Sequence, residues 1–544
     1  MKTLPSLLLC ALLAVSMAVP QTRVTGTLLD RDGKPMSYAE VHVRNGMIDT
    51  TLLTARVAPD GAYSITVPAA GACYIEYSAV DHDSHQVPFV SRGGGDARIN
   101  VRLDGYDLKD DLSGMQFVQL KPDLSYGETF TPRKQADGTY VADIGTDQPV
   151  FRYEVKGLEK SGRTINGTLS ESYGYDGGGD YFSVLTPRNG SVKVVFDPAK
   201  LIRGRRASTV EFPGVHGGLA KLPDVIEASN KRQQEYAAAF AAYEAKNKGG
   251  EGFTYDWGPA AAAVQKALAD EKDPLVREEL WMERLGYLFM SGKARGNPEK
   301  DEALGHVSPG SPLWVFHLNL LSMLMYDTTG GNAFAETVLA GQSDPGVKGT
   351  MLMSKLYSAR YAGKKEEART IYNRIVKECE GTRWAKMARE RFSGDMKVFD
   401  GAHAPVFSFV ALEDSAKTFS NESFKGKYLL IDFWAVWCGP CVAEMENLHK
   451  AYERFKGDNF AVLSLSFDNS PADVKKFRES KWKMPWNHAF VPQGFENPVS
   501  KAFEVDAIPK PVLIDPSGTI VAMTTELRGT NLAKTLEQYL GRRP

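Results

Sequence analysis

The chain has 544 residues, too many for one hydrophobic core, and at roughly 150 residues per domain it predicts three or four domains. Its 65 Lys and Arg residues nearly balance its 67 Asp and Glu residues, which gives a formal net charge of -2 at pH 7. A nearly neutral chain has no global field that would attract nucleic acid or an anionic membrane surface, so we expect neither as a partner.

The N-terminal residues 1–18 have the pattern of a cleavable secretory signal peptide. Lys2 precedes a short apolar run, and small residues stand at Ser16 and Ala18. The run is shorter than the roughly 20 residues of a membrane-spanning helix, and no later segment is long and apolar enough to span. We therefore expect a periplasmic or otherwise exported protein without a transmembrane segment in the mature chain. Cys10 lacks the small residue that usually precedes a lipidated cysteine, so we expect no lipid anchor.

Residues 21–103 predict a small β-sandwich. Short β-type runs such as Val24–Leu29 alternate with turn residues such as Asp32–Pro35. This pattern resembles the carboxypeptidase-regulatory-like fold, an accessory module, and the resemblance carries no catalytic residue. Three histidines could be imagined as metal ligands, but we interpret them as scattered surface residues: His42, His82 and His85.

Residues 104–210 continue in β style and predict a second β-rich, sandwich-like module, with Phe151–Val155 and Ser191–Phe196 among its candidate strands. The composition then changes to Ala, Glu, Lys, Leu and Met, and residues 221–396 predict an α-helical array. Between Leu356 and Phe392 the spacing of small and aromatic residues resembles a tetratricopeptide-type helical hairpin. Such an array either presents a groove to a partner or serves as a rigid spacer.

The most informative stretch is Trp434–Cys441, which follows the apolar run Tyr428–Phe433 and precedes a helix-like segment. A Cys-x-x-Cys at a strand-to-helix turn can close a disulfide within one helical turn. The first cysteine then lies where unpaired backbone N–H groups and the helix dipole favour a thiolate. This placement predicts redox chemistry. The alternatives are a static structural bridge and half of a zinc site, which would need a second closely spaced Cys or His pair.

Residues 401–544 resemble the TlpA/ResA-like branch of the thioredoxin superfamily, which contains exported thiol:disulfide oxidoreductases. The resemblance rests on the entry strand Ala404–Phe409, on Leu429–Ala435 running up to Trp-Cys-Gly-Pro-Cys, and on Ala507–Asp515 with its cis-proline position. It implies an α/β thioredoxin fold. The expected fold class is therefore multidomain, with two N-terminal β-sandwich-like modules, an α-helical array and a C-terminal α/β thioredoxin domain.

The resemblance also implies catalytic roles for three residues. Cys438 would be the nucleophile that forms a mixed disulfide with the substrate, and Cys441 would resolve it. Asp432 matches the buried aspartate that accepts the proton of the resolving cysteine, directly or through a water molecule. The alternative for Asp432 is an ordinary carboxylate at the end of a strand.

Five further positions are implied in substrate binding. Pro509 is expected in the cis form, which exposes the backbone of Ile508 for pairing with an extended substrate segment, flanked by Trp437. The pair Gly439 and Pro440 indicates a reducing dithiol, because strongly oxidising relatives often have a histidine there that stabilises the thiolate.

Two positions depart from the family pattern. Glu446 stands where relatives often have a proline, so the residue that would kink the helix is absent. Lys510 follows the cis-proline position, where threonine is usual. A cation there could lower a thiolate pKa or select acidic substrates, but we favour a solvent-facing lysine.

Together these features predict an enzyme, an exported thiol:disulfide oxidoreductase of the protein-disulfide reductase type. Its substrates would be exported proteins with disulfides, and a membrane thiol electron donor of the CcdA or DsbD type would recharge it. It would need no metal and no cofactor beyond the Cys438–Cys441 pair. The alternative is a binding or adaptor protein for a polysaccharide or protein ligand, in which the thioredoxin domain is an accessory redox sensor.

Overall fold

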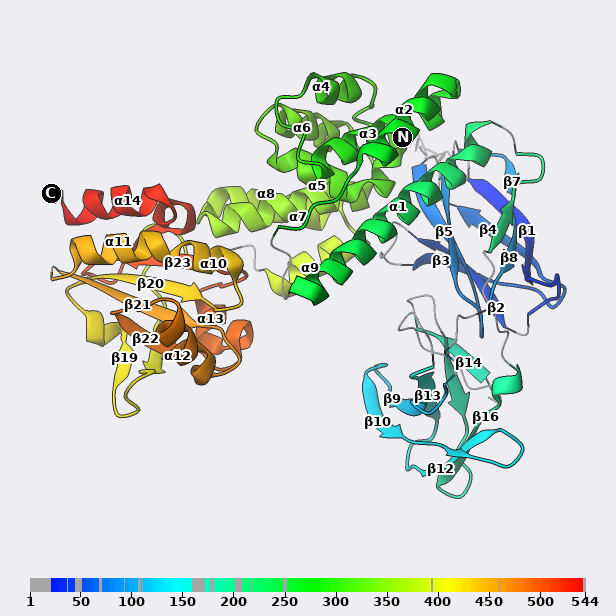
Figure 1. The fold of residues 1–544 in the computed structure, drawn as a ribbon, viewed down its shortest axis with the longest axis horizontal. Coiled ribbons are helices and arrows are strands. Elements are labelled where there is room, and N and C mark those ends of the chain that lie inside the picture. The colour runs from blue at the N-terminus through cyan, green and yellow to red at the C-terminus, as the bar shows by residue number, and fades with distance from the viewer. Residues whose placement is uncertain are drawn as a thin grey trace, which may run out of the picture. The chain divides into compact units, whose positions relative to one another are not determined.

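The computed structural model describes residues 21–541 (Figure 1). Within that range the residues that are not described are 37, 45–50, 68–70, 92, 106–108, 110, 159–171, 177–180, 201–207, 216, 248–251, 393–394 and 458. The predicted signal peptide at residues 1–18, with Cys10, lies outside the described residues. The chain divides into two compact units, residues 1–347 and residues 348–544.

The first unit begins with two sheets that share one core. One sheet has the strand order β17-β8-β1-β4, with β7 paired to β1, and the other has the order β3-β2-β5-β6. Alternate residues of both sheets supply the core, for example Val24, Tyr77 and Val101. The strands are β1 (Thr22–Asp30), β2 (Ala39–Arg44), β3 (Thr51–Arg56), β4 (Ala62–Val67), β5 (Gly71–Ala79), β6 (His85–Ser91), β7 (Asp96–Arg98), β8 (Asn100–Leu103) and β17 (Thr209–Glu211).

A second group of strands lies between β8 and β17 in the sequence. Its two sheets have the orders β10-β9-β13-β15-β14 and β11-β12-β16, and both contribute to one core that includes Phe117, Tyr153 and Val194. Because β17 pairs with β8, the chain returns to the first group after completing the second. The strands are β9 (Gln116–Leu120), β10 (Tyr126–Phe130), β11 (Arg133–Lys134), β12 (Tyr140–Gly145), β13 (Phe151–Lys156), β14 (Ser172–Tyr175), β15 (Tyr181–Leu185) and β16 (Ser191–Phe196).

The prediction that the histidines lie on the surface is wrong for His42 and His82. Both are buried. The two ring nitrogens of His42 each lie 3.0 Å from a hydroxyl oxygen, of Thr54 and of Ser78, and burial lowers the pKa of this ring to about 4. The Nδ1 atom of His82 lies 2.8 Å from the carbonyl oxygen of Val80. Hydrogen-bond partners on both ring nitrogens allow the neutral imidazole of His42 to be buried.

Helices follow, from α1 to α9, and the boundary between the two units falls within α7. Local sequence explains their starts. The Asp273 carboxylate accepts hydrogen bonds from the backbone N–H groups of Leu275 and Val276, and Pro274 begins α3. The helices are α1 (Gly218–Asn247), α2 (Gly258–Asp270), α3 (Pro274–Met290), α4 (Pro298–Gly305), α5 (Leu318–Tyr326), α6 (Gly331–Gly341), α7 (Pro345–Tyr361), α8 (Lys365–Glu378) and α9 (Arg383–Arg391), with short 3-10 turns at Pro198–Lys200 and Pro312–Phe316.

The second unit is built around a five-stranded sheet of order β22-β21-β20-β23-β24. Strands β20, β21 and β22 are parallel, β23 is antiparallel to β20, and β24 is antiparallel to β23. Figure 1 shows α11 and α14 on one face of this sheet and α12 on the other. The elements are β18 (Ser408–Val410), β19 (Thr418–Ser420), β20 (Tyr428–Trp434), α10 (Gly439–Ala443), α11 (Met445–Phe455), β21 (Phe460–Ser466), α12 (Pro471–Ser480), β22 (Asn487–Phe490), α13 (Pro498–Ala502), β23 (Lys510–Ile514), β24 (Ile520–Met523) and α14 (Thr530–Leu540), with 3-10 turns at Asn421–Phe424, Gly494–Glu496 and Thr524–Leu527.

The sheet positions the Cys-x-x-Cys segment through its central strand. Strand β20 is buried along almost all of its length because it has sheet neighbours on both edges and helices on both faces. It ends at Trp434, directly before the loop that leads to Cys438. The strand therefore holds the loop against the C-terminal edge of the parallel strands.

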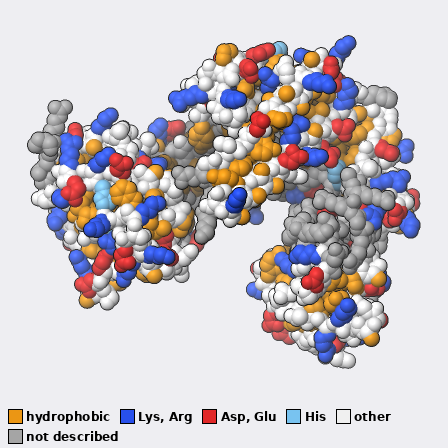
Figure 2. All heavy atoms as spheres, in the orientation of Figure 1, with side chains coloured by type: hydrophobic (Ala, Val, Ile, Leu, Met, Phe, Trp, Pro, Cys, Tyr) orange, Lys and Arg blue, Asp and Glu red, His pale blue; other side chains and the backbone are white. Residues whose placement is uncertain are grey.

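Charged side chains of both signs are interspersed on the face of the protein that Figure 2 shows, in keeping with the net charge of -2. Among the described residues, no helix combines the length and the apolar character needed to cross a bilayer.

Candidate active site

The dithiol lies at the start of α10. Cys438 is the N-cap residue of this helix, with an extended backbone, and its Sγ accepts a hydrogen bond from the Cys441 N–H at 3.2 Å. Pro440 occupies the first turn, where a missing backbone N–H costs no hydrogen bond. The Cys441 N–H would also stabilise a thiolate on Cys438 after reduction.

The two cysteines differ in access to solvent. They form a disulfide with an S–S distance of 2.01 Å, in which Cys438 is 6% exposed and Cys441 is 1% exposed. Trp437 is 58% exposed directly before the pair, and Gly439 and Pro440 are exposed after it. A substrate can therefore reach the sulfur of Cys438 more readily than that of Cys441.

The loop before β23 lies opposite the dithiol. Its Ile508–Pro509 peptide bond is cis, in agreement with the expectation for this segment. Strand β23 pairs with β20 through Lys510 and Phe433, which brings the loop to the same edge as the cysteines. The Ile508 carbonyl oxygen lies 3.7 Å from Cys438 Sγ. The structure thus brings together the dithiol and the backbone that were predicted to contact a substrate.

Asp432 is a buried carboxylic acid two residues before the end of β20. It is 8% exposed, and the Ser464 hydroxyl donates to its Oδ2 at 3.4 Å. Burial raises the pKa of Asp432 to about 7, and the negative charge of Glu444 adds to the rise. A pKa near 7 suits a group that takes up and releases a proton at neutral pH.

A small cavity connects this acid to the inner cysteine. Asp432, Cys441, Glu444, Pro509 and Arg528 are among the residues that line it, and its volume is about 20 Å³. That volume is close to what one water molecule requires. The geometry therefore suits proton transfer between Cys441 and Asp432 through a single water molecule.

Glu444 belongs to the site although the sequence analysis gave it no role. Its two carboxylate oxygens accept hydrogen bonds from Arg528 Nε at 3.2 Å, from the Gly529 N–H at 2.8 Å and from the Asn447 side chain at 3.1 Å. Glu444 lies three residues after Cys441, which places both side chains on one side of a helix. This spacing of three residues from Cys441 is the feature of the sequence that could have pointed to Glu444 as a site residue.

The helix after the dithiol is interrupted even without a proline. α10 ends and α11 begins at Glu444, two residues before Glu446. Hydrogen bonds from Arg528 and Gly529 hold Glu444 at this break. The interruption therefore does not depend on the proline that relatives often have.

The Asp468 carboxylate fixes the loop between the end of β20 and Cys438. The Asp468 oxygens accept hydrogen bonds from the Val436 N–H at 3.0 Å and 3.2 Å, and the Ser466 hydroxyl donates to Asp468 at 2.7 Å. Asp468 is buried just beyond β21, next to β20 in the sheet. It holds the segment between Trp434 and Cys438 in place.

The prediction that Lys510 faces solvent is wrong. Lys510 is buried, and its ammonium donates to the Glu504 carbonyl oxygen at 2.5 Å. Burial lowers the pKa of Lys510 to about 8, while the carboxylates of Asp506 and Glu504 oppose this effect. Position 510 lies in a strand buried on both faces, and a lysine can occupy it because the Glu504 carbonyl oxygen accepts a hydrogen bond from its ammonium.

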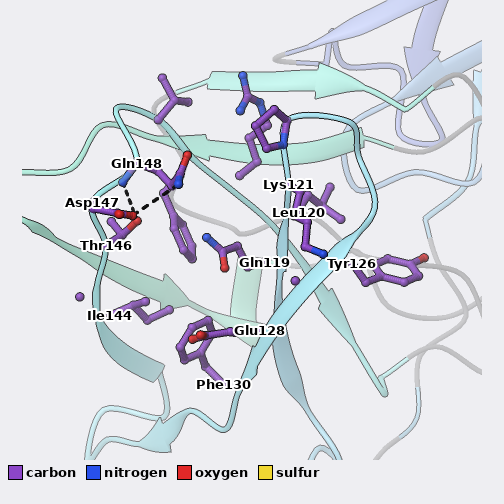
Figure 3. A pocket seen from close by; sticks show the side chains of 16 residues that line it. Gln119, Leu120, Lys121, Tyr126, Glu128, Phe130, Ile144, Thr146, Asp147 and Gln148 are labelled. Carbon is purple, nitrogen blue, oxygen red and sulfur yellow. Dashed lines mark hydrogen bonds between the residues drawn. The ribbon is translucent and has the colours of Figure 1, made fainter.

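A larger cavity lies in the second group of strands (Figure 3). Its volume is about 660 Å³, and none of its lining residues belongs to the dithiol site. Figure 3 shows Gln119 near its centre and Gln148 at one side, with Tyr126 at the opposite side. Tyr126 is 59% exposed, but the Lys156 ammonium lies 3.4 Å from the centre of its ring and covers one face. The lining mixes apolar side chains with amide groups and with charges of both signs.

Two further cysteines lie in the described part of the chain, and neither is paired in a disulfide. Cys73 is buried, and burial raises its pKa to about 12; Cys379 is also buried. No three His, Cys, Asp or Glu residues among those described are arranged to hold a metal ion.

Comparisons with known proteins agree with the geometry of the second unit. Residues 401–523 match the AhpC/TSA family. The thiol-disulfide oxidoreductase ResA of Bacillus cereus is 31% identical over 150 residues, which cover 27% of this chain and 81% of that protein. ResA of Bacillus subtilis is 27% identical over 150 residues, covering 27% of this chain and 78% of that protein.

Solved structures match the same share of the chain. The thioredoxin domain of a thiol-disulfide oxidoreductase from Bacteroides vulgatus is 34% identical, with a TM-score of 0.24, and the match covers 26% of this chain and 98% of that domain. Thioredoxin-like oxidoreductases work with a cysteine pair, and here that pair is Cys438 and Cys441. Through its C-terminal domain, the chain therefore belongs to the AhpC/TSA family, among the ResA-like thiol-disulfide oxidoreductases.

Proposed function

We propose that this protein is an exported protein-disulfide reductase, with Cys438 as nucleophile, Cys441 as resolving cysteine and Asp432 as proton acceptor. One observation carries the proposal: a buried acid with a pKa of about 7 shares a water-sized cavity with the inner cysteine. This arrangement supplies what the resolving step needs, which is a base that is accessible to Cys441 and shielded from bulk solvent.

The reaction starts from the reduced dithiol. The Cys438 thiolate attacks one sulfur of a substrate disulfide, the substrate S–S bond breaks, and the departing sulfur takes up a proton. Cys441 then gives its proton to Asp432 and attacks Cys438 Sγ, and the bond between Cys438 and the substrate breaks. The second substrate sulfur leaves as a thiolate and takes up a proton from Asp432 or from solvent. The substrate gains two electrons and two protons, and the protein is left with the Cys438–Cys441 disulfide.

Residues around the dithiol support binding of an extended substrate. Trp437 is exposed beside Cys438, and the Ile508 backbone lies next to its sulfur, with Pro509 behind it. A peptide segment could pair with the Ile508 backbone as an added strand and place its own disulfide against Cys438. Gly439 and Pro440 bring no charge to the thiolate, which favours the reducing direction.

Export and recharging complete the proposal. Residues 1–18 have the pattern of a signal peptide, so the substrates would be exported proteins with disulfides. Each turnover oxidises the dithiol, and a donor of two electrons and two protons must restore it. A membrane thiol donor of the CcdA or DsbD type would supply them.

A binding function is the second candidate, and the cavity in Figure 3 favours it. Amide side chains such as Gln119 and Gln148 could hydrogen-bond a polysaccharide or a polar protein segment. In this reading the dithiol serves as an accessory redox sensor.

An insulin-type disulfide reduction assay distinguishes the reductase function from the binding function. Wild type should reduce insulin with turnover, and neither Cys438→Ser nor Cys441→Ser should sustain it. Absence of cysteine-dependent turnover in the wild type would leave the binding function as the better account.

A further inference from the structure

Tyr361, the last residue of α7, contacts the active-site loop from outside the segment that matches the AhpC/TSA family. Its hydroxyl donates to the Pro509 carbonyl oxygen at 2.7 Å and accepts a hydrogen bond from Arg528 Nη1 at 3.1 Å. All three residues belong to the second compact unit. The Tyr361 side chain precedes the thioredoxin-like domain in sequence, and it is hydrogen-bonded to the carbonyl oxygen of the cis-proline of that domain.

The end of α7 is anchored to the domain at more than this one point. The Thr524 hydroxyl donates to the Tyr361 carbonyl oxygen at 2.6 Å. The neighbouring Arg360 is buried and pairs with Glu504 at 3.4 Å and Asp506 at 3.5 Å, in the segment that leads to Ile508. The adjacent residues Arg360 and Tyr361 therefore hold the cis-proline loop at two points, Arg360 before Ile508 and Tyr361 at Pro509.

The Tyr361 hydroxyl also joins this loop to the inner side of the dithiol. Arg528 donates through Nη1 to Tyr361 and through Nε to the Glu444 carboxylate at 3.2 Å. Glu444, Arg528 and Pro509 line the cavity that contains Cys441 and Asp432. The hydroxyl thereby links the substrate-facing loop to the wall of the proton-transfer cavity.

We propose that Tyr361 is a positioning residue of the dithiol site, which fixes the Pro509 carbonyl so that the Ile508 backbone is held ready to pair with an extended disulfide substrate. This inference rests on the proposed reductase function. The position of the loop decides whether a substrate strand can pair beside Cys438, because the Ile508 carbonyl oxygen lies 3.7 Å from Cys438 Sγ. A small disulfide that makes no strand pairing needs only access to Cys438.

The test compares full-length variants on two substrates, insulin and the small aromatic disulfide 5,5′-dithiobis(2-nitrobenzoate). Tyr361→Phe keeps the ring and removes only the hydroxyl. It should raise KM for insulin about fivefold, the factor that corresponds to one net hydrogen bond, with kcat and the rate on the small disulfide within about twofold of wild type.

Tyr539→Phe is the matched control. The Tyr539 hydroxyl also donates to a backbone carbonyl oxygen, that of Val521, at 2.7 Å, and its ring contacts Tyr428 at the end of β20 away from the dithiol. It should cost similar thermal stability and leave the insulin KM unchanged. Arg528→Lys keeps a positive charge near Glu444 but cannot reach both partners, so it should also raise KM for insulin by more than it changes the rate on the small disulfide.

The outcomes separate this inference from the proposed function. A wild-type protein without cysteine-dependent insulin turnover contradicts the reductase function itself. With an active wild type, an unchanged insulin KM in Tyr361→Phe contradicts the positioning role. Equal losses on both substrates would also contradict it, because they indicate general damage to the site. If Tyr361→Phe does not fold, the same comparison with Arg528→Lys decides.

Discussion

Replacing Asp432 with asparagine should make the second unit more stable at pH 8. An aspartate that has a pKa of 3.8 in the unfolded chain and of about 7 in the fold is penalised when it is ionised in the fold. The unfolded chain releases its proton near pH 4, whereas the folded protein keeps it until about pH 7. The penalty therefore grows through that window and is complete above it.

The size of this penalty follows from the shift in the pKa of Asp432 between the unfolded and the folded chain. A difference of about 3 pKa units at about 1.4 kcal/mol each corresponds to roughly 4 kcal/mol at pH 8 and to nearly nothing below pH 4. Asparagine has nearly the same shape and no charge, so Asp432→Asn should recover most of this amount at pH 8. Hydrogen exchange of the β20 amides measures the gain within the second unit, at matched pH for variant and wild type.

Asp515→Asn provides a control with the opposite sign. The Asp515 carboxylate accepts hydrogen bonds from the Ser517 side chain and from backbone N–H groups, and these bonds keep its pKa below the usual value. Its charged form is favoured in the fold, so this variant should lose stability above pH 4. A gain for Asp432→Asn that is equal at pH 4 and pH 8, or a loss at pH 8, would refute the assignment of a buried, proton-accepting acid.

Three further results are expected. Cys441→Ser should accumulate a mixed disulfide with substrate proteins on a non-reducing gel, while Cys438→Ala should form none; a trapped complex with Cys438→Ala would reverse the two roles. Glu444→Gln removes a negative charge that raises the Asp432 pKa, so the pH profile of single-turnover insulin reduction should shift to lower pH, and a shift to higher pH would contradict the coupling. Lys510 is penalised when charged, so stability should rise between about pH 8 and pH 10.5 by roughly 3 kcal/mol, and Lys510→Met should abolish this rise in hydrogen-exchange measurements of β23.

The central elements of the site could be predicted from sequence because their signals are local. A continuous apolar strand, a Cys-x-x-Cys at its end and a proline before a second apolar strand are all readable within a few residues. The structure brings Cys438, Asp432 and Pro509 together in one unit, as the resemblance to thioredoxins implied. Their catalytic and substrate-binding roles remain predictions.

The network behind the dithiol could not be predicted because its members come from distant parts of the chain. Tyr361, Glu444 and Arg528 meet only after α7, α11 and the turn that follows β24 have packed together. A tyrosine at the end of a helix gives no sign of which carbonyl it will bond.

Lys510 and His42 were misplaced for a related reason. Both side chains are polar, so exposure was the reasonable expectation from residue type alone. Each is buried because a partner satisfies it that residue type alone does not reveal. The partner is the Glu504 carbonyl oxygen, six residues earlier, for the lysine, and the Thr54 and Ser78 hydroxyls of adjacent strands for the histidine. The pairing of β17 with β8 across the second group of strands likewise depends on long-range contacts.

The reduction potential of the Cys438/Cys441 pair tests the proposed reductase most directly. Equilibration of the full-length protein with glutathione or dithiothreitol buffers, followed by thiol labelling, gives this value. The uncharged Gly439 and Pro440 predict a potential near that of reducing thioredoxins, about -270 mV. A potential close to that of strongly oxidising relatives, about -120 mV, would contradict the proposal and assign the protein to disulfide formation.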